Sequence, residues 1–80
     1  MPNLSSQRQN PTLVALGQAV RRLRETKGLS QESLALRAEV DRAYVGRVER
    51  GDNAAALLTL KRIADALGIS MSALMAEAGL

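Results

Sequence analysis

Apolar residues recur every three or four positions along most of this chain, which is the spacing of one face of an α-helix. The alternation at every second position that would predict a strand is absent. Five stretches carry the helical spacing, and their apolar residues are Leu13, Leu16, Val20 and Leu23, then Leu34 and Ala35, then Val45 and Val48, then Leu57, Leu60, Ile63, Ala64 and Leu67, and last Met71, Leu74, Met75 and Ala78. The pattern predicts an all-α domain in which five short helices pack around one core.

Residues that start and stop helices delimit these stretches. Side chains suited to cap a helix N-terminus stand before four of them, at Asn10, Ser30, Asp41 and Ser70, and the first is followed by a proline suited to the first turn. Glycines that can end a helix stand at positions 28, 51 and 68. The first nine residues are polar and aperiodic, so we expect a flexible arm over residues 1–9 and a folded domain over residues 10–80.

Residues 30–51 hold two short helices with a bend at 38–40 between them. Two helices joined by such a turn form a helix-turn-helix unit, whose second helix can enter the major groove of DNA. An arginine guanidinium there can donate two hydrogen bonds to guanine, and small residues allow close approach. The outer face of the second helix has both kinds, in Arg42, Ala43, Gly46, Arg47 and Arg50. An ordinary solvated basic face is the alternative interpretation.

Composition narrows the possible partners. The 80 residues, enough for one small domain, include neither cysteine nor histidine, which removes thiol chemistry and the usual zinc ligands. Paired carboxylates in a pocket-forming context are missing too, so we expect no enzyme, no metal and no cofactor. Tyr44 is the only aromatic residue, which argues against a stacking platform for single-stranded bases. Lysine and arginine outnumber aspartate and glutamate by 11 to 8, which favours a polyanionic partner.

The pattern shows neither a membrane anchor nor a secretion signal. No segment has the roughly 20 consecutive apolar residues that are needed to cross a bilayer. The first residues are polar, unlike those of a signal peptide. We therefore expect a cytoplasmic protein without a membrane partner.

Three runs together carry a resemblance to a known family. LRETKGLSQESLALRAEV, then VGRVERG, then TLKRIADALGIS resemble the lambda repressor/Cro-type, or XRE, family of helix-turn-helix proteins, over about residues 13–75. The segment VDRAYVGRVERG is especially similar to controller proteins of restriction–modification systems. The resemblance implies a five-helix lambda repressor-like DNA-binding domain, with the helix-turn-helix unit at about residues 30–51.

The resemblance also implies roles for individual residues. It places Arg42, Ala43 and Arg47 where relatives contact base edges, and it places at the DNA backbone or the helix cap Gln31, Asp41, Tyr44, Arg50 and Asn53. It further implies an ion pair between Arg24 and Glu49 that fixes the recognition helix on its scaffold, and an arginine fork suits a carboxylate. The alternative is a surface pair worth less than about 1 kcal/mol.

The chain departs from the family pattern at three places. Glu39 stands in the turn where relatives usually have glycine, and a left-handed residue there costs an L-amino acid roughly 1–2 kcal/mol. The loop at 52–56 lacks the basic and Asn-Pro-Ser residues of relatives, which leaves Asn53 or a backbone amide to contact phosphate. Arginine and alanine replace the glutamine, asparagine or serine that relatives use to read bases, which hints at guanine in the site.

These observations predict a sequence-specific regulator of transcription that binds double-stranded DNA. Relatives bind palindromic operators as symmetric dimers, and a candidate dimer interface lies near the C-terminus, at Leu58, Met71, Met75, Ala78 and Leu80. The alternative for the two methionines is that they fill the small core. The alternative function is an antitoxin or a protein-interaction adaptor with the same fold.

Overall fold

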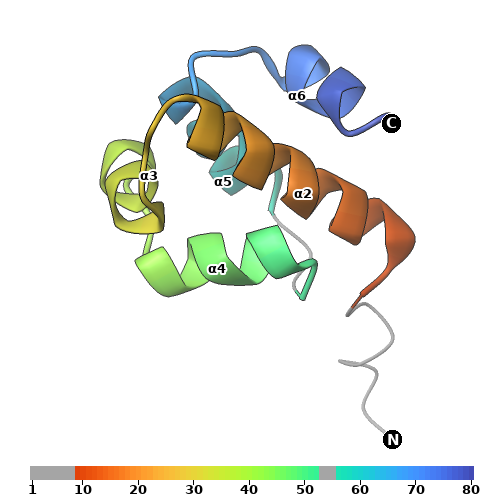
Figure 1. Ribbon diagram of the computed structural model, residues 1–80, viewed down its shortest axis with the longest axis horizontal. Coiled ribbons are helices and arrows are strands. Elements are labelled where there is room, and N and C mark those ends of the chain that lie inside the picture. Colours follow the sequence, from red (N-terminus) through yellow and green to blue (C-terminus); the bar gives the residue numbers. More distant parts are fainter. Residues whose placement is uncertain (1–8, 53–55) are drawn as a thin grey trace, which may run out of the picture.

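Five helices make up the part of the chain that the structure describes, as the spacing of apolar residues predicts (Figure 1). The computed structural model describes residues 9–52 and 56–80, and these ranges contain helices but no strand. The helices are α2 at Pro11–Thr26, α3 at Gln31–Ala38, α4 at Arg42–Arg50, α5 at Leu57–Ala66 and α6 at Met71–Glu77. The predicted all-α fold is confirmed. None of these helices is long and apolar enough to cross a membrane.

The longest helix, α2, runs across the middle of the molecule and packs against α4 and α6. In Figure 1, α4 lies below α2, α6 lies above it, α3 closes one end, and α5 passes behind. The stripes expected to face inward supply the largest fully buried side chains, which are Leu34, Ile63, Leu67, Leu74, Val20 and Val45. Leu57 is the exception, because it was expected on the inner face of its helix and is 71% exposed. One aliphatic core therefore joins all five helices.

The helix starts agree with the expected caps in three of four cases. The side chains of Asn10, Ser30 and Ser70 each accept a hydrogen bond from a backbone N–H group of the first turn that follows. Asp41 occupies the N-cap position of α4, but its side chain makes no such bond. The prediction for Asp41 is correct in position and wrong in chemistry, since the carboxylate does not cap the helix.

The turn between α3 and α4 has the left-handed backbone that its family position implies. Glu39 has φ of 61° and ψ of 44°. Its N–H group donates to the carbonyl of Leu36 at 3.3 Å, and the N–H group of Val40 donates to that of Ala35 at 3.0 Å. This is the hydrogen-bond pattern of a Schellman ending, which usually has glycine at the left-handed position. Glu39 therefore has a strained backbone conformation, because its Cβ lies too close to the carbonyl oxygen that follows it.

Glu39→Gly is expected to raise the free energy of unfolding by about 1 kcal/mol, since removing the Cβ relieves a strain of roughly 1–2 kcal/mol and the extra freedom of glycine in the unfolded chain offsets part of it. The melting temperature in a thermal unfolding experiment should rise by about 4–8 °C. Glu39→Ala is the control because it removes the carboxylate and keeps the Cβ. An equal gain in both variants would mean that the carboxylate, and not the backbone, is unfavourable.

The backbones of α2 and α4 touch at Gly17. A Cβ atom at this position would lie 2.2 Å from the carbonyl oxygen of Val48 and 2.7 Å from that of Glu49, far inside the contact distance of real atoms. The only side chain that fits between the two helices here is therefore a hydrogen atom. This contact sets the position of α4 on α2.

The last helix is joined to α2 by a polar clasp on the outside and by one leucine on the inside. Leu74 is the buried residue of α6. Arg22 Nη2 donates to the backbone carbonyl of Glu77 at 2.8 Å, and Arg22 Nε lies 3.7 Å from Glu77 Oε2. A cation at the C-terminal end of a helix also interacts favourably with the helix dipole. The Arg22 contacts and the buried Leu74 together hold α6 against the C-terminal half of α2.

Candidate nucleic-acid interface

The recognition helix α4 buries one face and exposes the other. Val45 and Val48 pack in the core, which anchors the helix along its inner side. The exposed residues of α4 are Arg42, Ala43, Arg47 and Arg50. The prediction from helical spacing is thus confirmed for the inner face and for these four residues of the outer face. Three guanidinium groups and one methyl group form the outer surface.

Gly46 is the exception to this division. It was expected on the outer face, as a place where another backbone could come close, but it is buried. A Cβ at this position would lie 3.2 Å from Nη1 of Arg50 and 3.8 Å from Oε1 of Gln31. Two long side chains therefore cover the glycine, one from α4 itself and one from α3. The expectation of an open approach at Gly46 is wrong.

An ion pair beneath the recognition helix joins it to α2. Arg24 Nε donates to Glu49 Oε2 at 2.6 Å, and Arg24 Nη2 donates to Glu49 Oε1 at 3.1 Å. The side chains are only 11% and 4% exposed. Arg24 Nη1 also donates to the carbonyl of Leu29 at 2.8 Å, so the guanidinium is well satisfied. The predicted pair between Arg24 and Glu49 is confirmed, and its burial excludes the alternative of a solvated surface pair.

This pair keeps Arg24 charged and fixed. The hydrogen bonds that Arg24 donates to the Glu49 carboxylate raise the pKa of the Arg24 guanidinium above its ordinary value, although burial acts in the opposite direction. Because the Glu49 carboxylate already holds the Arg24 guanidinium by two hydrogen bonds, this side chain loses little more conformational freedom when α4 binds a partner. The arrangement makes the base of α4 rigid.

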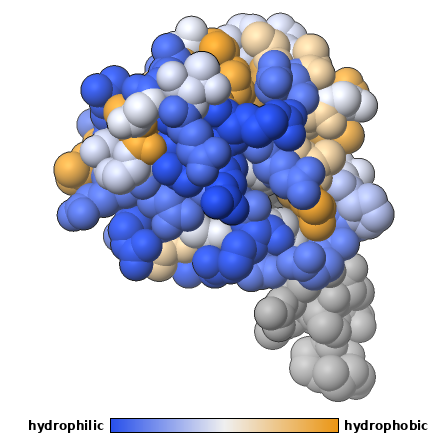
Figure 2. Space-filling view, in the orientation of Figure 1, coloured by the Kyte–Doolittle hydropathy of each residue, from blue (hydrophilic) through white to orange (hydrophobic). Residues whose placement is uncertain are grey.

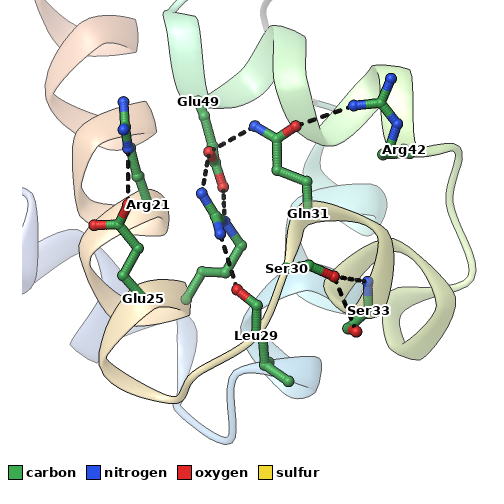
Figure 3. Close-up of polar contacts among 9 residues, drawn as sticks. Arg21, Glu25, Leu29, Ser30, Gln31, Ser33, Arg42 and Glu49 are labelled. Carbon is green, nitrogen blue, oxygen red and sulfur yellow. Dashed lines mark hydrogen bonds and ion pairs between the residues drawn. The ribbon is translucent and has the colours of Figure 1, made fainter.

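Gln31 connects the buried pair to the exposed end of α4 (Figure 3). Its Nε2 donates to Glu49 Oε1 at 3.0 Å, and its Oε1 accepts from Arg42 Nη1 at 3.3 Å. The amide can make both bonds only in one orientation, since a nitrogen donates and an oxygen accepts. Gln31 was expected to contact a DNA phosphate. In the free protein its side chain links the start of α3 to Arg42, in the first turn of α4, and to Glu49, two turns further along.

The structure differs from expectation at Tyr44. The ring is half-buried against the core, and its hydroxyl is buried without a hydrogen-bond partner among the described residues. The guanidinium carbon of Arg47 lies 5.8 Å from the ring centroid. The hydroxyl is therefore covered in the free protein, and the contact of Tyr44 with the DNA backbone stays a prediction. Its ring instead supports Arg47 by a cation–π contact.

The other expected backbone contacts lie at the two ends of α4. Asp41 is exposed before its first turn, and Arg50 is exposed in its last turn, with Nε donating to Asp52 Oδ2 at 2.9 Å. Asn53 lies outside the described residues, as do residues 1–8 of the expected arm. Among the described residues no group of three or more acidic side chains is arranged to hold a metal ion.

The expected dimer interface is split between exposed and half-buried residues. Leu58 and Leu80 are 77% and 54% exposed, whereas Met71, Met75 and Ala78 pack partly against the core. Hydrophobic residues gather in the upper right of Figure 2, where α6 lies, while the face over α2 and α4 is mostly hydrophilic. Two further exposed leucines, Leu36 and Leu57, were not expected.

Residues 20–74, more than half of the chain, match the model of the family HTH_3, helix-turn-helix. The chain belongs to the helix-turn-helix family. It is similar to the control protein C.MunI of a Mycoplasma species, with 35% identity over 85% of this chain and 93% of the relative. It is also similar to the control protein C.BamHI of Bacillus amyloliquefaciens, with 36% identity over 75% of each chain.

A solved structure agrees with these relatives. The restriction-modification controller protein C.AhdI from Aeromonas hydrophila has 48% sequence identity and a TM-score of 0.76, over 78% of this chain and 94% of that one. The XRE-type family, the resemblance to controller proteins and the lambda repressor-like fold are thereby confirmed. So is the expected class of function, a DNA-binding regulator of transcription.

Two features of this helix-turn-helix protein were missed in the sequence. The first is the contact at Gly17, although an interior glycine costs a helix up to about 1 kcal/mol and can signal a close approach. The second is the role of Gln31 and of Gln9 in bonding to other elements. The resemblance singled out Gln31 only as a contact to DNA, and the spacing of apolar residues gives no signal for the hydrogen bonds of either glutamine to other elements.

Proposed function

We propose that this helix-turn-helix protein regulates transcription as a homodimer on a palindromic operator, with α4 of each subunit in the major groove. Arg42, Ala43 and Arg47 contact base edges, and the surrounding polar residues contact phosphates. The observation that carries this proposal is the construction of α4. Its exposed guanidinium groups stand on a helix whose inner face is fixed by a buried bidentate ion pair. Preorganised donors of this kind suit the reading of guanine.

The contacts to phosphate surround the recognition helix. Gln31 begins α3, where a helix N-terminus favours an anion, and its exchange of partners from Arg42 to a phosphate would free that guanidinium for a base. Arg50 lies at the opposite end of α4, and Asn53 follows it in the chain. The C.AhdI and C.MunI proteins are named as controllers, which supports the same role for this chain.

Two copies are needed because one such module buries only about 600–1,000 Å² on DNA. The surfaces that we propose to pair are those of α5 and α6, at Leu58, Met71, Met75, Ala78 and Leu80. The exposed leucines are the hydrophobic part of this surface that the core does not use. Pairing there would place two recognition helices on successive turns of DNA, about 34 Å apart.

Leu58→Asp is expected to convert a dimer into a monomer in sedimentation at tens of micromolar protein, because a charge would be buried in the interface without a partner. Leu36→Asp is the matched control, since Leu36 is 75% exposed and lies on α3. It should leave the dimer intact. A wild-type protein that is monomeric at this concentration, or equal dissociation in both variants, would contradict pairing through α5 and α6.

The test of DNA reading uses duplexes selected by the protein from a random pool, followed by Arg47→Ala. We expect a palindromic consensus, and we expect the substitution to cost about 1–3 kcal/mol and to relax the preference at one base pair. Arg21→Ala is the control, because Arg21 is exposed on α2 and paired with Glu25. An equal loss on every duplex would make Arg47 a phosphate contact. A salt dependence near zero would favour the protein-interaction adaptor or antitoxin instead.

A further inference from the structure

Gln9, two positions before the first residue of α2, is hydrogen-bonded to the end of the recognition helix. The N–H group of Gln9 donates to the carbonyl of Gly51 at 2.9 Å. The side-chain Nε2 of Gln9 donates to the carbonyl of Arg50 and to Asp52 Oδ1, both at 2.9 Å. Segments more than 40 positions apart in the sequence therefore meet at the C-terminal end of α4. The meeting point is the carboxylate of Asp52.

Asp52 in turn holds Arg50. Its Oδ2 accepts from Arg50 Nε at 2.9 Å, and the carboxylate side chain is 18% exposed while the arginine is 61% exposed. Nε is the nitrogen next to the aliphatic stem, so this bond restricts the rotation of the guanidinium. Nη1 lies back over Gly46, where a Cβ would come within 3.2 Å of it. The guanidinium thus lies along α4, although most of the side chain remains exposed to solvent.

We propose that Asp52 is a positioning residue for DNA binding, which aims Arg50 at a phosphate of the duplex and is itself held in place by Gln9. The proposal rests on the function proposed above. A free arginine side chain loses rotamer entropy when it is fixed on a partner. An arginine that is already oriented loses less of it, so binding is tighter. Gly46 contributes by leaving room for the oriented side chain.

The proposal predicts an effect opposite in sign to that of simple charge. An acidic residue close to DNA repels phosphates, so its removal should by itself tighten binding. If Asp52 orients Arg50, its removal should instead weaken binding for as long as Arg50 is present. In a protein that lacks Arg50 there is nothing to orient, and the plain charge effect should return.

The experiment measures the dissociation constant of the full chain for a random-sequence duplex of about 20 base pairs, two helical turns, over a series of salt concentrations. The variants are Asp52→Ala, Arg50→Ala and both together. Asp52→Ala should weaken binding by about five-fold and lower the salt slope by up to about 0.9, the value for one phosphate contact. The same substitution added to Arg50→Ala should leave binding unchanged or tighten it.

Tighter binding by Asp52→Ala in the presence of Arg50 would overturn the proposal and leave Asp52 as a repulsive charge only. Gln9→Ala gives a second measurement if Asp52→Ala does not fold, because it keeps both the carboxylate and the arginine. It should weaken binding by about two-fold, and tighter binding would overturn the proposal. Failure of the proposed function has a different signature: the wild-type protein itself would show a salt slope near zero.

Discussion

Gly17→Ala is expected to lower the free energy of unfolding by about 3 kcal/mol or more, among the largest effects of any single substitution in this protein. The added methyl group would overlap the carbonyl oxygens of Val48 and Glu49, at 2.2 and 2.7 Å. These atoms belong to the backbone of α4, so no side chain can rotate away to make room. Relief requires α4 to move off α2. Urea unfolding, followed by circular dichroism, measures the loss.

Gly28→Ala is the matched control for this prediction. Gly28 has φ of +70°, and a Cβ there would meet nothing within 4 Å. Its substitution should cost only the backbone strain of roughly 1–2 kcal/mol. If the two variants lost equal stability, the close contact between α2 and α4 would not exist in solution. A folded Gly17→Ala protein should also lose affinity for DNA, because its recognition helix is displaced.

Arg24→Ala is expected to destabilise the protein by about 3 kcal/mol, because it leaves the carboxylate of Glu49 buried without its bidentate partner. Gln31 would still donate one hydrogen bond to that carboxylate, which keeps the loss near the lower end for a broken buried pair. The free energy of unfolding in urea is the measurement. The guanidinium also bonds the carbonyl of Leu29, so the segment after α2 should loosen as well.

The comparison for this second prediction is Arg21→Ala. Arg21 pairs with Glu25 at 3.1 Å on the outer face of α2, but both side chains are more than half exposed, so the loss should stay below about 1 kcal/mol. A further variant replaces both partners, as Arg24→Met with Glu49→Leu. It should recover much of the lost stability, since the unpaired charge is gone. Equal unfolding energies of Arg24→Ala and Arg21→Ala would show that the buried pair contributes little.

The elements could be predicted from the sequence because each one has local signals. The apolar spacing gave the helices, and Ser30, Ser70 and Gly51 gave ends that the backbone confirms. The pair of Arg24 and Glu49 came from the family resemblance, and no local pattern would have joined residues 25 positions apart. The spacing of apolar residues and the capping residues therefore predict the helices, whereas the ion pair that fixes α4 could be predicted only from the family resemblance.

The remaining features depend on how separate elements meet. Gly46 lies on the outer face by helical spacing, yet side chains from two helices cover it, which no helical wheel records. Tyr44 has a polar end, but the depth to which its ring sinks into the core decides whether that end reaches solvent. Asp41 has the right type for a cap, and only its side-chain conformation could show that it makes no capping bond.

The clasp between Arg22 and Glu77 bears on which operators the protein can accept. It fastens α6, which contributes to the proposed pairing surface, to α2, and α2 meets α4 backbone to backbone. In the proposed dimer, rigid contacts therefore connect the pairing surface on α6, through α2, to the recognition helix α4. Each base pair inserted between two half-sites shifts the second by about 3.4 Å along the duplex and about 34° around it. If the protein pairs as proposed, we expect so rigid an assembly to discriminate against operators whose half-sites are separated by a spacer of the wrong length.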